Sequence, residues 1–380
     1  MSHTRAAFVL TLALSVVAWP AASKDDAVTP VWPVDDAWTE DFPGSDTLSL
    51  VIGESRLLVV ESAQISARAW SDGAVLWKSE LTATARPVVD GGRVFVPAGD
   101  AIHALSDATG AVQWRLPGRV ATSPTARSGW LIVPTEDGSL QGVSAADGRE
   151  VWRIALPALL TTPVVIDGDL VVGGGADGLI RAWQITDGAL RWTRETGTRP
   201  TQLLAAGGVV FVGGENGQLR SLQQRDGHVN WTYSYNMSIT GRLASDERHV
   251  YATTIDNSVH AHAFNGHQRW HQYLAFRVVG GMVSDAGSVF VPQSNGEIRI
   301  FLAKNGVRAG RLNASPPKST VIGGLASGGF GDHLRMALTT TAAGTRIALT
   351  TYRRTGLAAV PATSAPSGTP LLFTLPGGQP

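Results

Sequence analysis

Cysteine is absent from this chain of 380 residues. Its absence excludes disulfides, zinc–thiolate sites, cysteine nucleophiles and covalently attached c-type haem. It also excludes a lipobox, the export motif whose cysteine carries a lipid. An excess of charge is lacking as well, because 31 basic residues balance 31 acidic ones. No overall electrostatic field therefore draws the chain toward nucleic acid or an anionic membrane.

A long apolar run occurs only near the amino terminus. Arg5 precedes the apolar stretch Ala6–Trp19, and Ala21-Ala22-Ser23 provides the small residues of a cleavage site. This pattern predicts a secretory signal peptide over residues 1–23, and the run is short for a membrane-spanning helix. An uncleaved membrane anchor is the alternative. We expect the mature protein in the periplasm or secreted, without a lipid anchor of its own.

Tyrosine and phenylalanine are few, whereas tryptophan occurs 12 times and recurs at a regular spacing. A glycine is followed four residues later by a tryptophan at Gly73/Trp77, Gly110/Trp114, Gly148/Trp152, Gly188/Trp192, Gly227/Trp231 and Gly266/Trp270. Subtracting successive tryptophan numbers gives 37, 38, 40, 39 and 39. A repeat of about 40 residues is typical of β-propeller blades.

Each copy of the repeat predicts four short strands. In residues 162–195, apolar runs are separated by turns at Asp167-Gly168, Asp177-Gly178 and Asp187-Gly188. Such dipeptides favour type I′ hairpin turns, and the regular turn spacing argues against helices from Val28 to Thr355.

The two ends of the propeller sequence depart from this pattern. Asn305-Gly306 begins a further copy in which Gly310 replaces the tryptophan, whereas Trp38 precedes Trp77 by 39 residues. We therefore predict an all-β, eight-bladed propeller of four-stranded antiparallel blades over residues 28–357, closed by the N-terminal strand. A seven-bladed ring without that strand is the alternative. Residues 358–380 are rich in proline and glycine and predict a flexible tail.

The repeated tryptophan is expected to dock neighbouring blades against each other. Its large flat side chain buries 150–250 Å² and so suits a wedge between sheets. We assign this structural role to Trp38, Trp77, Trp114, Trp152, Trp192, Trp231 and Trp270.

The repeat resembles the PQQ-like, or quinoprotein, propeller repeat, most clearly over residues 162–192 and 205–231. Within that group the chain is most similar to the BamB family of accessory subunits of the outer-membrane β-barrel assembly machinery. The resemblance covers residues 30–356. It implies a non-catalytic, periplasmic scaffold that assists outer-membrane protein assembly, monomeric within a complex, with a cell-envelope protein as partner and no cofactor or nucleic acid. Since the lipobox cysteine usual in that family is missing, attachment to the outer membrane would depend on the partner.

Two other functions stay open. The first is a PQQ-dependent dehydrogenase or its inactive relative, which would bind PQQ and calcium; the absence of the paired cysteines of such enzymes and the placement of most acidic residues in turns disfavour it. The second is a ligand-binding propeller of the cell envelope.

Binding residues are expected on the loops that join the last strand of one blade to the first strand of the next. These loops are the least repetitive segments, and function on repeat scaffolds usually lies there. Apolar and arginine side chains dominate interface energies, which selects as interface candidates Arg119, Leu159, Leu160, Arg199, Met237, Phe276 and Arg277.

One register of the third strands carries mostly polar residues, which could form a partly basic ring for an anion or acidic peptide or could each serve their own blade: His103, Gln141, Arg181, Arg220, His260 and Arg299. His260 and His262 are two apart in one strand and share a face, as a metal pair would. A packed, hydrogen-bonded pair explains them better, and we predict no metal site and no catalytic residue.

Overall fold

The computed structural model describes residues 34–43, 48–53, 56–246, 248–285, 287–313, 320–321, 326–330, 333–342 and 346–354. All the regular secondary structure of these residues is β-strand. No helix among them could serve as a membrane span. The predicted signal peptide, residues 1–23, and the predicted tail, residues 358–380, lie outside the described residues.

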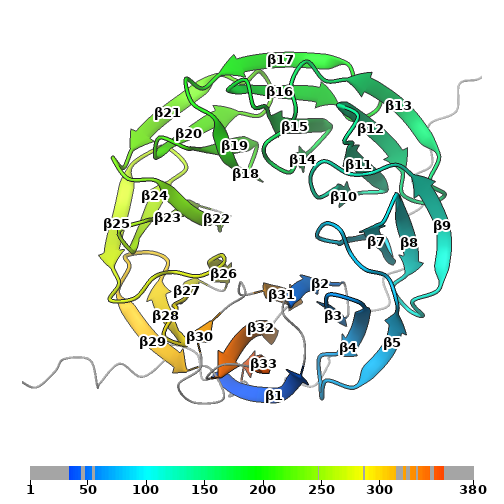
Figure 1. Ribbon diagram of the computed structural model, residues 1–380. Coiled ribbons are helices and arrows are strands. Elements are labelled where there is room, and N and C mark those ends of the chain that lie inside the picture. The colour runs from blue at the N-terminus through cyan, green and yellow to red at the C-terminus, as the bar shows by residue number, and fades with distance from the viewer. Residues whose placement is uncertain are drawn as a thin grey trace, which may run out of the picture.

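Seven four-stranded antiparallel sheets follow one another around a ring in chain order (Figure 1). In each of these blades the four strands pair with their neighbours in sequence, from the centre of the ring outward. The first four blades are β2 (Ser49–Ile52), β3 (Arg56–Val60), β4 (Ile65–Ala69), β5 (Val75–Ser79); β6 (Val88–Asp90), β7 (Arg93–Ala98), β8 (Ala101–Ser106), β9 (Val112–Pro117); β10 (Thr125–Arg127), β11 (Trp130–Pro134), β12 (Ser139–Ser144), β13 (Glu150–Ala155); and β14 (Val165–Asp167), β15 (Leu170–Gly174), β16 (Leu179–Gln184), β17 (Leu190–Glu195). The next three are β18 (Pro200–Ala206), β19 (Val209–Gly214), β20 (Gln218–Gln223), β21 (Val229–Ser234); β22 (Ile239–Ser245), β23 (His249–Thr254), β24 (Ser258–Ala263), β25 (Gln268–Tyr273); and β26 (Val283–Asp285), β27 (Ser288–Pro292), β28 (Glu297–Leu302), β29 (Arg308–Asn313).

The prediction of eight four-stranded blades is wrong. The structure is a propeller of seven four-stranded blades, and the two ends of the propeller sequence form a five-stranded sheet that we call the closing sheet. Its strands are β1 (Val34–Pro43), β30 (Thr320–Val321), β31 (Ala326–Phe330), β32 (His333–Ala342) and β33 (Arg346–Arg354). The reason is local: no repeat with regularly spaced turns follows Asn313, so two short strands, β30 and β31, share one edge of the long strand β32.

The predicted pairing of the N-terminal strand with the strand near Tyr352 is confirmed. β1 runs antiparallel to β33, with Trp38 opposite Thr351 and Phe42 opposite Ile347. The closing sheet lies between the seventh and first blades (Figure 1). The propeller edge that an open array would expose is therefore covered by strands from both ends.

The turns differ between the two kinds of hairpin. Between first and second strands, both residues of Gly91-Gly92 and of Gly207-Gly208 have positive φ, as type I′ turns require. Between third and fourth strands, only the glycine is left-handed, as at Gly188, whose φ is 71°. The Asp187 carboxylate accepts a hydrogen bond from the Ala189 amide there. At Asp167-Gly168, Asp177-Gly178 and Asp187-Gly188 only the glycine has a positive φ, so the type I′ prediction is wrong for these turns, and the turn before the tryptophan ends in a bulge.

Each repeated tryptophan packs against the blade that follows it. A Cβ atom added to Gly110 would lie 2.6 Å from the indole of Trp77, because the ring rests directly on the backbone of that glycine. The same contact joins Trp38 to Gly73, Trp77 to Gly110, Trp114 to Gly148, Trp152 to Gly188, Trp192 to Gly227, Trp231 to Gly266 and Trp270 to Gly306. The turn glycine therefore has two roles, since it supplies the positive φ and admits the neighbour's indole.

Small residues face the tryptophans across each blade. The partner in the third strand is alanine, glycine or serine in six blades: Ala67, Ala104, Gly142, Ala182, Ser221 and Ala261. In the seventh blade the sizes are exchanged, because Gly310 occupies the tryptophan position and buried Ile300 lies opposite it. Core volume is thus maintained where the indole is missing.

Candidate functional site

One face of the ring carries the loops that connect successive blades, together with the turns between second and third strands. We call it the loop face. Five of these connecting loops are each fastened to the turn of the blade they enter by a backbone hydrogen bond: Glu136 N to Arg119 O, Ala176 N to Leu159 O, Glu215 N to Arg199 O, Ile255 N to Ser238 O and Ser294 N to Arg277 O. Residues 119, 159, 199, 238 and 277 therefore occupy equivalent positions on a rigid support.

The predicted interface residues lie on this face. Arg119, Arg199 and Arg277 are exposed, as are Leu159, Met237 and Phe276. Leu160 is only 6% exposed and packs toward Gly173 inside the fourth blade, so its side chain is part of the core. The residues are distributed around the loop face over five connecting loops and do not converge on a single cavity.

Apolar side chains gather around the sixth blade. Besides Met237 and Phe276, the exposed side chains of Ile255 and Tyr273 belong to this part of the loop face. The Ile255 amide is bonded to the residue that follows Met237, and Tyr273 ends β25 just before Phe276. Sequence reasoning missed Ile255, although an isoleucine where other blades have a polar or small turn residue was a usable signal.

The arginines and His260 of the polar register make their side-chain contacts within their own blades. Each arginine among its members binds an acceptor in its own blade: Arg181 pairs with Asp177, Arg220 with Gln218 and Arg299 with Glu297. His260 lies 3.2 Å from Thr254 Oγ1 and 3.3 Å from Gln268 Nε2, also in its own blade. The interpretation that each polar residue serves its own blade fits these contacts.

The two neighbouring histidines of β24 are packed among aromatic rings. His262 lies 4.4 Å from the ring of Tyr233 and stacks on Trp231, while His260 lies 4.4 Å from the ring of Tyr235, measured between centroids. Burial, followed by the charges of His262 and His271, lowers the pKa of His260 to about 4. In the described part of the chain no group of three or more His, Asp or Glu side chains could hold a metal ion.

Two arginines of different blades interact electrostatically. Arg86 precedes β6 in the second blade and Arg242 lies in β22 of the sixth blade. Burial and, more weakly, the positive charge of Arg242 lower the pKa of Arg86 to about 10. Arg86 donates from Nη2 to the carbonyl of Leu50 at 3.0 Å, which holds its side chain against the first blade.

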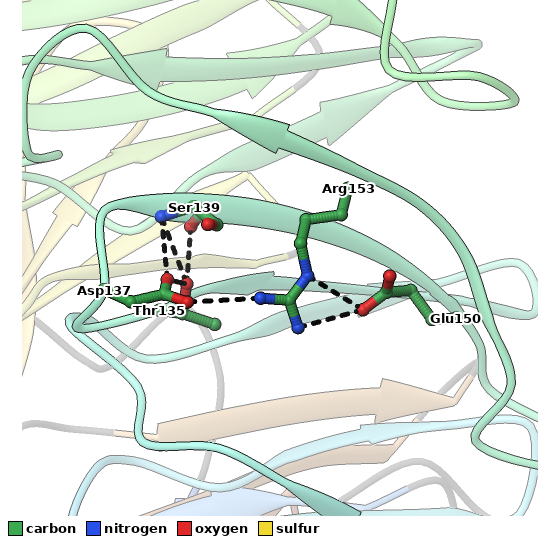
Figure 2. A network of polar contacts seen from close by, with 5 residues as sticks. All are labelled: Thr135, Asp137, Ser139, Glu150 and Arg153. Atoms are coloured by element: carbon green, nitrogen blue, oxygen red, sulfur yellow. Dashed lines mark hydrogen bonds and ion pairs between the residues drawn. The ribbon is translucent and has the colours of Figure 1, made fainter.

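The third blade carries a polar cleft of about 300 Å³ on the loop face. Figure 2 shows the network beside it, in which Arg153 donates to Asp137 at 3.1 Å and to Glu150 at 3.1 Å. Thr135 and the Ser139 amide also donate to Asp137, and these bonds lower the pKa of its carboxyl group. Sequence reasoning missed this cleft, because the cleft forms only where the arginine that binds the turn aspartate comes from the fourth strand of the blade instead of the third.

Fold and repeat define the protein as a PQQ-like β-propeller. A family model described as outer membrane protein assembly factor BamB matches residues 61–203, 138–238 and 215–348. Since these matches cover most of the chain, the protein belongs to this family.

Solved structures share the fold at low sequence identity. BamB from Moraxella catarrhalis is 19% identical with a TM-score of 0.64, over 84% of this chain and 97% of that one. The quinohemoprotein alcohol dehydrogenase ADHIIG from Pseudomonas putida HK5 is 13% identical with a TM-score of 0.64, over 90% and 78%. The enzyme from Comamonas testosteroni is 12% identical with the same TM-score, over 87% and 78%. No curated protein sequence matches the chain. These likenesses establish the fold, and function is argued from the site.

Proposed function

We propose that this protein is a non-catalytic scaffold of the periplasm that assists outer-membrane protein assembly by docking its loop face onto a protein partner. The observation that carries the proposal is the set of exposed arginine and apolar side chains held at equivalent loop positions by backbone hydrogen bonds to the turns. Exposed arginine and large apolar residues on a rigid support are what protein interfaces use as anchors. Family membership supports the choice of outer-membrane assembly.

Location and attachment follow from the same proposal. The N-terminal segment directs export, and the mature protein acts in the periplasm without a lipid of its own. Because the chain contains no cysteine, its association with the outer membrane runs through the bound partner. The protein binds the partner complex as a monomer.

Site-specific crosslinking tests the docking face. A photoreactive amino acid replaces Phe276 on the loop face. In the matched control it replaces Val112, an exposed apolar residue at the start of β9, next to the turn between third and fourth strands and away from the loop face. After irradiation of living cells, position 276 should yield an adduct that contains an outer-membrane assembly component, and position 112 should not. Equal adducts from both positions, or adducts without any such component, contradict the proposal.

A quinone-dependent oxidoreductase is the second candidate, favoured by the shared fold of the two quinohemoprotein alcohol dehydrogenases. The calcium site of such enzymes needs clustered carboxylates and amides, and the described residues offer no cluster of three acidic or histidine side chains for it. Addition of PQQ and calcium to the purified protein distinguishes the candidates. A stoichiometric bound-quinone absorbance would favour the enzyme, and its absence at saturating quinone favours the scaffold.

A further inference from the structure

The polar cleft of the third blade contains hydrogen-bonding groups that the fold itself does not use. It is lined by polar or charged side chains, without an aromatic residue: Arg119, Thr135, Glu136, Asp137, Gln141 and Arg153. Both nearby carboxylates of the network in Figure 2, Asp137 and Glu150, are already engaged by Arg153. Glu136 is exposed at the rim, 4.0 Å from Arg119, so the groups of the cleft without a short hydrogen bond are Gln141, Arg119 and Glu136.

Gln141 is the buried group of the cleft. Its residue surface is 2% exposed, yet within the described part of the chain its side-chain amide has no hydrogen-bond partner. The amide is not fully enclosed, because the side chain lines the cleft, so a ligand in the cleft can supply the hydrogen bonds that the fold does not. The side chain has both a donor and an acceptor free, which is the complement of a peptide group.

Arg119 is the charged group at the rim. Its side chain is 66% exposed, and its ion pair with Glu136 is long, at 4.0 Å. A guanidinium in this state keeps its donors free for a carboxylate, with which it forms charge-assisted, often bidentate hydrogen bonds.

The fourth blade shows why the third has a cleft. At the position equivalent to Gln141, Arg181 is buried and its guanidinium binds Asp177 in the adjacent turn, with Nη1 3.1 Å from Oδ1. In the third blade the turn residue Asp137 is bound instead by Arg153, which lies on the outer strand β13 directly opposite Gln141. Gln141 is shorter than arginine and does not bind the turn aspartate. The space that a longer side chain would fill therefore remains as the cleft, and the Gln141 amide lines it.

We propose that this cleft binds an acidic residue in an extended segment of a protein partner, with its carboxylate on Arg119 and a neighbouring peptide group on Gln141. The proposal deepens the proposed function, since it takes the loop face to be a protein-binding surface. A sugar is disfavoured because the lining has no aromatic ring for it to stack on. A free carboxylate would satisfy Arg119 alone and leave the buried amide unpaired.

Peptide binding to the purified full chain tests the proposal. Fluorescence polarisation measures binding of a labelled, end-blocked peptide with four Ser-Glu repeats, and a peptide with four Ser-Gln repeats is the uncharged counterpart. We expect Arg119→Gln and Gln141→Leu each to weaken binding of the acidic peptide roughly tenfold. The control is Arg225→Gln, an exposed arginine in the turn between β20 and β21, away from the loop face, which should leave the affinity unchanged. Free acetate should not compete at comparable concentrations.

The outcomes separate cleft binding from general attraction. Equal loss from Arg225→Gln and Arg119→Gln, or equal binding of both peptides, would mean unspecific electrostatics and overturn the proposal. Unchanged affinity of a folded Gln141→Leu variant would overturn it as well. If that variant does not fold, the side-chain amide resonance of Gln141 is followed by NMR in the unmodified protein, and it must shift on peptide addition. Failure of the crosslinking experiment with retained peptide binding would reject outer-membrane assembly and keep the cleft.

Discussion

Each tryptophan indole rests on a glycine of the next blade, and this contact makes the glycine irreplaceable for two separable reasons. Gly110 has a φ of 71°, which disfavours any side chain, and an added Cβ would meet Trp77 at 2.6 Å. Gly92 has a φ of 72° but open space around its Cβ position. The pair therefore separates backbone strain from crowding.

Replacing these two glycines by alanine should have unequal effects. Gly92→Ala should lower the free energy of unfolding by about 1 kcal/mol, which is the cost of a left-handed alanine. Gly110→Ala should lower it by about 2–4 kcal/mol, because crowding of the indole is added to that cost. Urea denaturation of both variants measures the difference. Equal losses would mean that the indole moves aside freely.

The indole nitrogen offers a second comparison between blades. Trp77 donates from Nε1 to the carbonyl of Asp107 at 2.7 Å, whereas the buried Nε1 of Trp114 has no partner. Trp77→Phe should therefore cost about 1 kcal/mol more than Trp114→Phe, because only the first removes a hydrogen bond, while the Asp107 carbonyl keeps the bond donated by Arg56 Nη1. Thermal and urea denaturation of the two variants are the measurement, and the reverse order would contradict the assignment of this bond.

Among the strands, β24 is the element whose stability should depend on pH. The pKa of His260 is lowered to about 4, mainly by burial and then by His262 and His271, while Asp256 raises it slightly. The pKa of neighbouring His262 is lowered as well, again by burial. An unfolded chain would bind these protons near the ordinary value of 6.5. Stability contributed by the neutral rings is therefore complete above about pH 6.5 and is lost as the pH falls toward 4.

His260→Gln should remove part of this pH dependence. We expect the wild-type protein to lose on the order of 2 kcal/mol more than the variant between pH 7 and pH 4. His267→Gln, at an exposed position in the turn between β24 and β25, is the control substitution. Urea midpoints at a series of pH values provide the measurement. Parallel pH profiles for His260→Gln and wild type would show that His260 titrates normally in the fold.

For the molecule as a whole, much of the fold could be predicted because the residues that repeat in the sequence, the tryptophans and the turn glycines, are the ones that make the contacts between blades. The tryptophan period and the turn glycines predicted four-stranded blades and closure by β1, and the structure has both. The blade count failed where the period ends, since residues after Asn313 carry no repeat from which strand number can be read. Loops of the candidate site could be located by their irregularity. The cleft could not be predicted, because it arises where Arg153 of β13, instead of residue 141 of β12, binds the turn aspartate. This difference is recognisable only when the pairing of the two strands is known.

Removal of β1 tests how far the ring depends on closure. A variant that begins after Pro43 loses the Trp38 contact with Gly73, its hydrogen bond to the Trp70 carbonyl and the ion pair between Glu40 and Arg68. It also leaves one edge of β33 unpaired, a known cause of self-association. We expect the melting temperature to fall by roughly 10 °C and oligomers to appear in size-exclusion chromatography. Addition of a peptide of residues 34–43 should reverse both effects, and an unchanged, monomeric variant would show that closure contributes little.

The position of β1 has a consequence for the order in which the molecule is assembled. Its side chains rest on the first blade, which is synthesised immediately after it, while its backbone partner β33 is the last strand of the propeller to be made. The N-terminal strand can therefore pack on the first blade throughout synthesis, before β33 is available to pair with its free edge. Pairing of β1 with β33 then becomes the final step of folding, and in every earlier intermediate the closing sheet is incomplete.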